Sequence, residues 1–242
     1  MDKRPGYNDR LFGSGFRSKL HLARFVWFKQ MIHRLKIRPK SIIELGCFDG
    51  KLLKYLDHKP ERYIGFDANW EGGLDIARAK WYGLDEFKFI CASTIDEITL
   101  KPSDRFDVFV CMETLEHIPP DEVENYLEKI SRHLDGYLFI TVPNEKGLMC
   151  ILKIIVKRLV GQNYDNYTLS EMFNAFIGRM RYVERREHKG FDYDTIIKMV
   201  GKYFDILKVA GQPLPFVNYR FSFTVTILGK SKIHQKLDNN IK

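Results

Sequence analysis

Two carboxylates and an imidazole fall within five positions of the stretch CMETLEHIPP, residues 111–120. Glu113, Glu116 and His117 are spaced i, i+3, i+4, so on one helical turn all three side chains project to the same side. Burying two carboxylates together is costly unless a cation or a proton compensates their charge. Two carboxylate oxygens and an imidazole nitrogen suit Mg²⁺, Mn²⁺ or Fe²⁺. The spacing therefore predicts a metal site, and the alternative is that His117 is a lone general base or a structural histidine.

A second histidine, His188 in the stretch REHKGFDYDTI, is the candidate fourth ligand. It precedes the last predicted helix. The long segment before it can fold back over the end of the sheet and bring His188 there. We expect Glu113, His117 and His188 to act on the substrate, and the metal set to be Glu113, Glu116, His117 and His188. The alternative role for His188 is a hydrogen bond that holds the preceding segment closed.

A glycine turn precedes these residues in the chain. The stretch ELGCFDG puts Gly46 and Gly50 where a predicted strand turns into a helix, and glycine there lets backbone N–H groups approach a negatively charged ligand closely. Asp67 ends the next strand, where a carboxylate can accept hydrogen bonds from both hydroxyls of a ribose. The combination predicts a site for a nucleoside-type cofactor, whereas the glycine turn alone would also fit tight strand-to-helix packing.

The elements that position these residues alternate between strand and helix, which predicts an α/β fold with a mostly parallel sheet. Near-continuous apolar runs are typical of strands covered on both faces. The predicted strands are 41–45, 63–67, 87–92, 106–111, 137–142, 204–211 and 221–230, and the predicted helices are 19–36, 50–56, 73–83 and 119–134. In an open α/β sheet the chemistry occurs beyond the carboxyl ends of the strands, and the stretch 111–120 lies there, following the fourth strand.

The interval 143–203 is much longer than an ordinary connection and predicts a lid over that end of the sheet, at about residues 145–190. Its stretch GLMCILKIIVKRLVG, 147–161, is apolar but too short to span a bilayer, and it carries three basic residues. We interpret it as a buried cap helix, with a helix lying on a membrane surface as the alternative.

Composition indicates one domain of 41–230, preceded by a basic arm and helix, 1–40, and followed by a disordered basic tail, 231–242. The formal charge is +8, and residues 1–40 hold eleven Lys or Arg against Asp2 and Asp9. Such a segment attracts nucleic acid, anionic lipid or a phosphorylated substrate, unless it is only a solvated helix face. The four cysteines are widely spaced, which favours reduced thiols. We expect a soluble cytoplasmic protein, with the inner face of the membrane as the alternative location.

The stretch ELGCFDG resembles the first motif of the class I S-adenosylmethionine-dependent methyltransferases, acid-x-Gly-x-Gly-x-Gly. Glu44, Gly46 and Gly50 match it, and Phe48 replaces the middle glycine. The resemblance implies a Rossmann-like seven-stranded sheet with helices on both faces and a lid inserted after strand five. It also implies S-adenosylmethionine as the cofactor.

The same resemblance assigns cofactor contacts along the chain. It implies that Gly46 and Cys47 border the methionyl part, that Asp67 holds the ribose, and that the backbone near Cys111 meets the ammonium group. It further implies that Ala68, Asn69 and Ser93 surround the adenine. From their position in the N-terminal arm alone, we expect Tyr7 or Arg17 to close over the carboxylate.

The stretch 111–120 is similar to two branches of that family. The ubiquinone-biosynthesis O-methyltransferases share the string CME..LEH.P, and the small-RNA 3′-terminal 2′-O-methyltransferases bind a divalent ion with Glu-x-x-Glu-His and a later histidine. The pairing of TVPNEKG with HKGFDYDTIIKMVGKYFDILKVAG is also similar to bacterial methyltransferases that modify surface sugars. We therefore expect O-methylation of a hydroxylated small molecule or glycan, such as a sugar diol. The alternatives are RNA 2′-O-methylation and a non-catalytic cofactor-binding partner protein.

Overall fold

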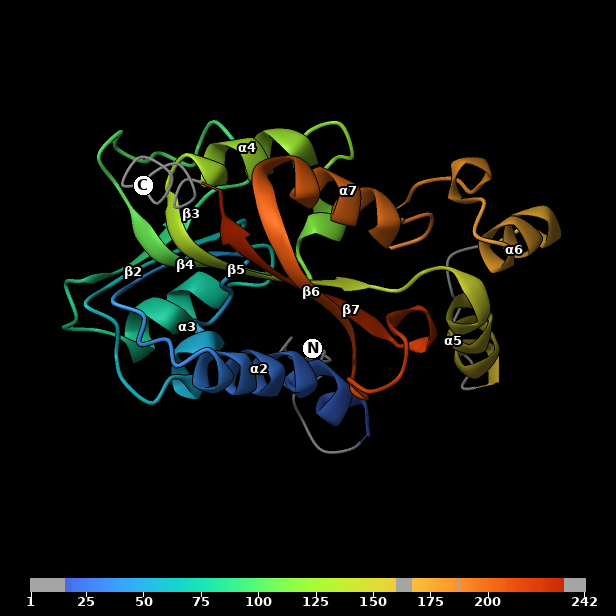
Figure 1. Ribbon diagram of the computed structural model, residues 1–242, viewed down its shortest axis with the longest axis horizontal. Helices are drawn as coiled ribbons and strands as arrows, with labels where there is room; N and C mark the ends of the chain where they lie inside the picture. Colours follow the sequence, from blue (N-terminus) through green and yellow to red (C-terminus); the bar gives the residue numbers. More distant parts are fainter. Residues whose placement is uncertain (1–15, 160–166, 187, 233–242) are drawn as a thin grey trace, which may run out of the picture.

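A seven-stranded sheet forms the centre of the computed structural model, which describes residues 16–159, 167–186 and 188–232 (Figure 1). The strand order is β3-β2-β1-β4-β5-β7-β6, and β7 runs antiparallel to both β5 and β6. The strands are β1 Ser41–Leu45, β2 Arg62–Asp67, β3 Phe87–Cys91, β4 Phe106–Met112, β5 Leu134–Pro143, β6 Phe204–Gln212 and β7 Thr224–Ser231. The predicted α/β fold with seven strands is confirmed.

Helices cover both faces of the sheet, as predicted (Figure 1). The α-helices are α2 Phe16–Arg34, α3 Gly73–Lys80, α4 Val123–Ser131, α5 Gly147–Leu159, α6 Leu169–Phe176 and α7 Tyr193–Tyr203. The short 3₁₀ helices are η1 Lys51–Tyr55, η2 Leu115–His117, η3 Met180–Tyr182 and η4 Tyr219–Phe221. Among the helices of these described segments, none has both the length and the apolar character needed to cross a bilayer.

The side chains of each strand alternate between two cores, as the pleat of a strand requires. In β4, Phe109 and Cys111 pack with α4 and α7 on one face, whereas Val108 and Val110 pack with α2 and α3 on the other. Figure 1 shows these two helix pairs on opposite sides of the sheet. Burial on both faces is the reason that the strands appear in the sequence as continuous apolar runs.

Two predicted helices differ from the structure. The stretch 50–56 forms only the five-residue 3₁₀ helix η1, and Pro60 follows closely before β2 begins. The stretch 119–134 shortens to α4, because β5 already begins at Leu134 and pairs there with Phe106 of β4. The N-terminal helix 19–36 is present as α2.

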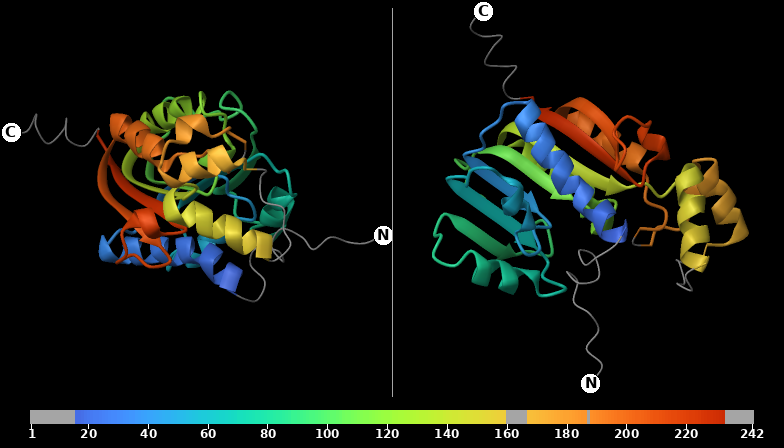
Figure 2. Two further views of the ribbon diagram at one scale, coloured as in Figure 1. Left: turned by 90° about the vertical axis from the view of Figure 1, so that its right-hand side faces the viewer. Right: turned by 90° about the horizontal axis from the view of Figure 1, so that it is seen from below.

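The segment after β5 contains α5 and α6, which lie together beyond the end of the sheet (Figure 2). Their inner sides share a small core of their own, made of Cys150, Ile154, Tyr167, Ala175, Met180 and Val183. Lys146, at the start of this segment, makes ion pairs with Asp192 and Asp194 at the start of α7. Both ends of the segment are therefore fixed to each other at the edge of the sheet.

The four cysteines are free thiols, and only Cys91 is exposed. Tyr7 and residues 233–242, which the sequence analysis assigned to an arm and a tail, lie outside the described residues.

Candidate active site

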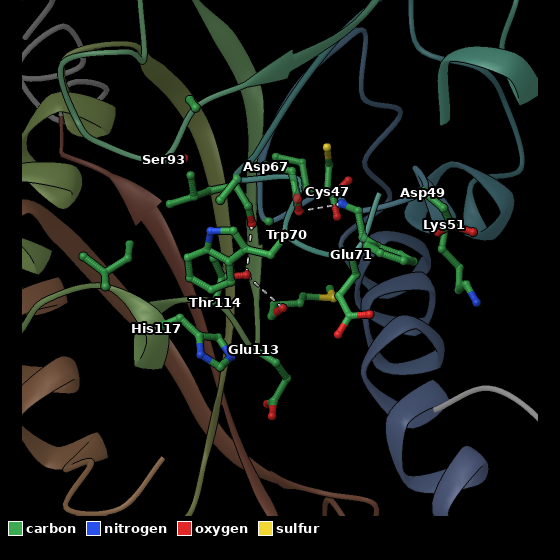
Figure 3. Close-up of a pocket in the computed structure, with 18 of the residues that line it drawn as sticks. Cys47, Asp49, Lys51, Asp67, Trp70, Glu71, Ser93, Glu113, Thr114 and His117 are labelled. Carbon is green, nitrogen blue, oxygen red and sulfur yellow. Dashed lines mark hydrogen bonds between the residues drawn. The ribbon is translucent and has the colours of Figure 1, made fainter. Parts of the chain in front are cut away.

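A cavity of about 320 Å³ opens at the carboxyl ends of β1, β2 and β4 (Figure 3). This is the place where the sheet order reverses, since β1 pairs with β2 on one side and with β4 on the other. The residues that line it are Arg24, Phe25, Glu44, Leu45, Gly46, Cys47, Phe48, Asp49, Lys51, Asp67, Ala68, Trp70, Glu71, Ala92, Ser93, Met112, Glu113, Thr114, His117, Ile118, Pro119 and Tyr126.

The two glycines of the turn after β1 have different roles. Gly46 lines the cavity with φ of 75°, and a Cβ atom there would lie 2.0 Å from the Thr114 Oγ1 atom. Gly50 has φ of 65°, and its Cβ would lie 2.9 Å from the rings of Phe89 and Trp81. Gly46 therefore admits a close approach of the end of β1 to Thr114 at the start of η2, whereas Gly50, outside the cavity lining, admits tight packing against aromatic rings.

Phe48 occupies the position where the resembling motif has its middle glycine. Its φ is 45°, so the backbone takes the left-handed conformation that glycine would adopt easily. A Cβ atom on Gly73 would lie 2.2 Å from the Phe48 ring, so the ring fits against α3 only because residue 73 is a glycine. The glycine at position 73, at the start of α3, thus makes room for the phenylalanine that replaces the middle glycine of the motif.

Asp67, the last residue of β2, is hydrogen-bonded to the turn that follows β1. Its carboxylate accepts hydrogen bonds from the Phe48 N–H at 2.9 Å and from the Asn69 N–H at 2.7 Å. A carboxylate has about four lone-pair sites, so it can accept hydroxyl hydrogens in addition. Ala68 and Ser93 also line the cavity.

Asn69 and Cys111, which the resemblance assigned to the cofactor, lie outside the cavity lining. The Asn69 side chain accepts a hydrogen bond from the Leu74 N–H at 3.0 Å and so stabilises the start of α3. Cys111 is fully buried, and burial raises the pKa of its thiol. Its neighbour in β4, Met112, is the residue that faces the cavity.

Glu44 brings a buried carboxyl group to the cavity. Burial, together with the negative charges of Asp49 and Asp67, raises its pKa to about 8 against a hydrogen bond of 2.6 Å from the Tyr63 hydroxyl and the positive charge of Arg24. Near neutral pH the group therefore remains largely protonated while the cavity holds no cationic ligand. A positively charged ligand in the cavity would favour its ionised form.

Arg24 of α2 is a cation that the sequence analysis missed. It is buried and lines the cavity, together with Lys51. The side chain of Arg17 and all of Tyr7, which were expected to close over the cofactor, lie outside the described residues. A basic residue within the apolar stretch LARFVWF of the first helix was the signal available in the sequence.

Glu116, His117 and His188 form a cluster in which one ligand atom of each lies within 4.8 Å of the others. The Nδ1 atom of His188 is 3.9 Å from the Oε1 atom of Glu116, and the two imidazole rings are 4.9 Å apart, edge to face. Glu116 is 1% exposed, and both of its carboxylate oxygens are buried without a hydrogen-bond partner among the described residues.

Glu113 is not a member of this cluster. It has φ of 53°, and η2 begins only at Leu115, so residues 113–117 do not form the single helical turn that was expected. The Glu113 side chain instead lines the cavity, where its Oε1 atom is buried and has no hydrogen-bond partner among the described residues. The backbone at Glu113 thus directs the two carboxylates to different sides.

Burial sets the ionisation of these groups. It raises the pKa of Glu113 and of Glu116, and the charge of Glu113 raises that of Glu116 further. It lowers the pKa of His188 to about 4, with a further contribution from His117. A neutral imidazole beside a carboxyl group that lacks hydrogen bonds is an arrangement that a divalent cation would stabilise.

Trp70 is a second residue of the cavity that sequence reasoning missed. It is 73% exposed, and its indole meets the His117 ring edge to face at 6.1 Å (Figure 3). It therefore lies where the cavity meets the Glu116, His117 and His188 cluster. The only signal in the sequence was that Trp70 lies shortly after Asp67, the last residue of β2.

A family model described as a methyltransferase domain matches residues 21–187. The chain belongs to the class I S-adenosylmethionine-dependent methyltransferases. The matched segment includes the whole cavity lining and the cluster except His188.

Ubiquinone biosynthesis O-methyltransferases are among the curated relatives of this methyltransferase. The protein of Hahella chejuensis is 31% identical over 180 residues, which cover 68% of this chain and 71% of that protein. The protein of Coxiella burnetii is 27% identical over 147 residues, or 54% of this chain. The match with the Coxiella proteins spans 61% of their length.

Solved structures share the methyltransferase fold. A methyltransferase from Clostridium acetobutylicum has a TM-score of 0.62 and 16% identity, with coverage of 93% of this chain and 95% of that one. The methyltransferase domain of bacterial CtHen1 has a TM-score of 0.56 and 14% identity, with coverage of 87% and 99%. At these identities the likeness concerns the fold alone.

Proposed function

We propose that this methyltransferase transfers a methyl group from S-adenosylmethionine to a hydroxyl oxygen of a small molecule or glycan with adjacent hydroxyl groups. The observation that carries the proposal is the position of His117. It lines the cavity and also belongs to the cluster with Glu116 and His188. A group held at the cluster would therefore lie next to a donor held in the cavity.

The cavity residues fit the parts of the donor. Asp67 can accept the ribose hydroxyls, and the cavity beside Ala68 and Ser93 can take the adenine. Arg24 supplies a cation for the carboxylate of the methionyl part. Glu44 supplies a carboxyl group whose ionised form a cationic donor would stabilise.

The cluster fits a divalent cation such as Mg²⁺ or Mn²⁺. Glu116, His117 and His188 would hold it, because Glu116 has two buried oxygens without hydrogen-bond partners among the described residues and His188 is neutral. Such an ion, when bound, supplies a Lewis acid that orients a diol and lowers the pKa of its hydroxyl group.

The chain's own residues would then position the reaction. The methyl carbon forms a bond to the acceptor oxygen while its bond to sulfur breaks, and the acceptor proton is released to a nearby base such as the Glu113 carboxylate, which lines the cavity and is not one of the proposed ligands of the ion. Trp70, at the mouth of the cavity, would help to exclude water from the reacting atoms. Because the sulfonium is already a reactive donor, positioning accounts for most of the rate.

The test is turnover of a diol acceptor by the full chain with EDTA, and then with added Mg²⁺ or Mn²⁺. We expect EDTA to abolish turnover and the ion to restore it. Glu116→Gln and His188→Ala should each lower the rate by at least about 10²-fold while leaving donor binding intact. If EDTA has no effect and both variants remain active, the metal part of the proposal is wrong.

RNA 2′-O-methylation is the second candidate, and the basic first 40 residues favour it. A ribose diol at an RNA end would fit the same cluster. Binding of a short RNA that weakens steeply with added salt, together with methylation of its terminal ribose, would replace the glycan by RNA as the acceptor.

A further inference from the structure

Two apolar stripes face the solvent on α5 and α6, the helices of the segment that was predicted to form a lid and that we call the lid. On α5 the spacing i, i+4, i+7, i+8, i+11 places five apolar side chains on one side of the helix, each between 41 and 82% exposed. These five are Leu148, Leu152, Ile155, Val156 and Leu159. The other side of α5, which carries Cys150 and Ile154, is buried in the core of the lid. The helix therefore has an apolar outer side that its own fold does not cover.

The neighbouring helix α6 repeats the pattern with the spacing i, i+4, i+7, i+8. Its exposed apolar side chains are Leu169, Phe173, Phe176 and Ile177, from 41 to 85% exposed. The two helices pack against each other and project together beyond the sheet (Figure 2). We call these nine side chains the lid surface. Exposed apolar patches of this kind mark sites of interaction.

The charges around the lid surface are mainly positive. Residues 147–159 and 167–182 contain five basic residues. Lys153 makes an ion pair with the buried Glu145, so the positive charge comes from Lys157, Arg158, Arg179 and Arg181. The same segments contain one acidic residue, Glu171, which makes an ion pair with the buried Lys189. A second copy of the chain docked on this surface would bring positive charges together, whereas a negatively charged surface would attract them.

We propose that the lid surface docks this protein on a membrane that contains anionic phospholipids. An amphipathic helix lies in the plane of the interface with its apolar side among the acyl chains and its basic residues at the headgroups. The 13 residues of α5 are too few to cross a bilayer, so the helix lies on the membrane and does not span it. The proposal does not depend on which acceptor is methylated.

The test is sedimentation of the full chain with vesicles of phosphatidylcholine, and with vesicles in which phosphatidylglycerol replaces part of it. We expect sedimentation with the anionic vesicles and a loss of it as salt is added. Ile155→Asp combined with Phe173→Asp should weaken binding at least about tenfold, because both side chains leave the apolar phase. Arg158→Gln combined with Arg179→Gln should weaken binding to the anionic vesicles only.

A matched control comes from α3. Ile76 is 46% exposed and Ile155 is 47% exposed, and Figure 1 places α3 and α5 at opposite ends of the molecule. Ile76→Asp should bind vesicles like the wild type. Calorimetry with S-adenosylmethionine verifies the fold of each variant. If the double variant does not fold, Leu159→Asp at the end of α5 replaces it in the vesicle assay, because this side chain is 82% exposed.

Three results would overturn the proposal. The wild type could stay in the supernatant with both kinds of vesicle, or the aspartate variants at α5 and α6 could sediment as well as Ile76→Asp. Sedimentation velocity without vesicles could show a dimer that the same variants dissociate, in which case a second copy covers the lid surface.

Discussion

At the scale of residues, the cavity combines groups whose ionisation depends on what is bound. The Glu44 carboxyl has a pKa of about 8, because it is buried beside Asp49 and Asp67. Glu113 and Glu116 have raised pKa values for the same main reason, burial. The unliganded protein therefore holds protons that cationic ligands would displace.

The pH dependence of stability follows from Glu44. Its pKa in the folded state is higher than the ordinary value of 4.5, so its contribution is complete below about pH 4.5 and is lost as pH rises through about 8. Between these values the free energy of unfolding should fall by up to about 1.4 kcal/mol per pH unit on account of this group. Denaturant unfolding of Glu44→Gln across the range should show a smaller slope. An unchanged slope would mean that Glu44 is ionised in the unliganded fold.

Gly46 gives a prediction about the cavity wall. Gly46→Ala places a Cβ atom 2.0 Å from the Thr114 Oγ1 atom in a left-handed conformation, so we expect a destabilisation of about 2 to 4 kcal/mol and loss of donor binding. Gly83→Ala is the control, since Gly83 also has positive φ but a Cβ there meets nothing within 4 Å. Equal thermal stability of the two variants would contradict the close approach of β1 to η2.

The positions of residues were predictable where one local pattern decides them. Asp67 at the end of β2 and Gly46 after β1 both line the cavity, and their contacts with the cofactor stay predictions. The left-handed backbone of Glu113 was not predictable, because helical spacing assumes that the turn begins at that residue. Arg24 was missed because only the packing of α2 on the sheet brings it to the cavity.

At the scale of elements, the lid is joined to the cluster through Lys189. This buried residue follows His188, and its Nζ atom is 2.9 Å from Glu171 at the start of α6 and 3.5 Å from Glu184. Glu171 also forms the capping box of α6 with Thr168, and its pKa is lowered to about 2 by hydrogen bonds, chiefly from Lys189, that outweigh its partial burial. The position of His188 therefore depends on α6.

Lys189→Met should loosen this connection. We expect turnover to require a higher concentration of the divalent ion and the thermal midpoint to fall. S-adenosylmethionine affinity should be unchanged, because the cavity does not include Lys189. Lys202→Met is the control, since Lys202 pairs with Glu124 at an exposed site. Loss of donor affinity in Lys189→Met would show that the lid also shapes the cavity.

The strands and α2 were predictable because burial on both faces leaves uninterrupted apolar runs in the sequence. The lengths of η1 and α4 were not predictable. The early start of β5, which pairs with β4 from Leu134, limits α4, and η1 ends at Tyr55 within a stretch whose local apolar pattern suits a longer helix. The pattern 147–161 was open to two interpretations from the sequence. In the structure the inner side of α5 is buried and its outer side is exposed, so the buried-cap interpretation describes the inner side only and the membrane-surface alternative stays a prediction.

At the scale of the whole molecule, the parallel strands β1, β2 and β4 bring residues from distant parts of the chain together at their carboxyl ends. The Glu44 carboxyl, the Asp67 carboxylate and the His117 imidazole meet there because parallel strands end on the same side. The segment matched by the family model contains the residues of this cavity, and we propose the cavity as the site of the donor.

The most direct test of the account is calorimetric titration of the purified full chain with S-adenosylmethionine, and in parallel with a nicotinamide dinucleotide. The account predicts one saturable site for S-adenosylmethionine that Asp67→Ala weakens at least about tenfold and Glu116→Gln leaves intact. Heat from the dinucleotide alone, or from neither ligand with a folded protein, would contradict it.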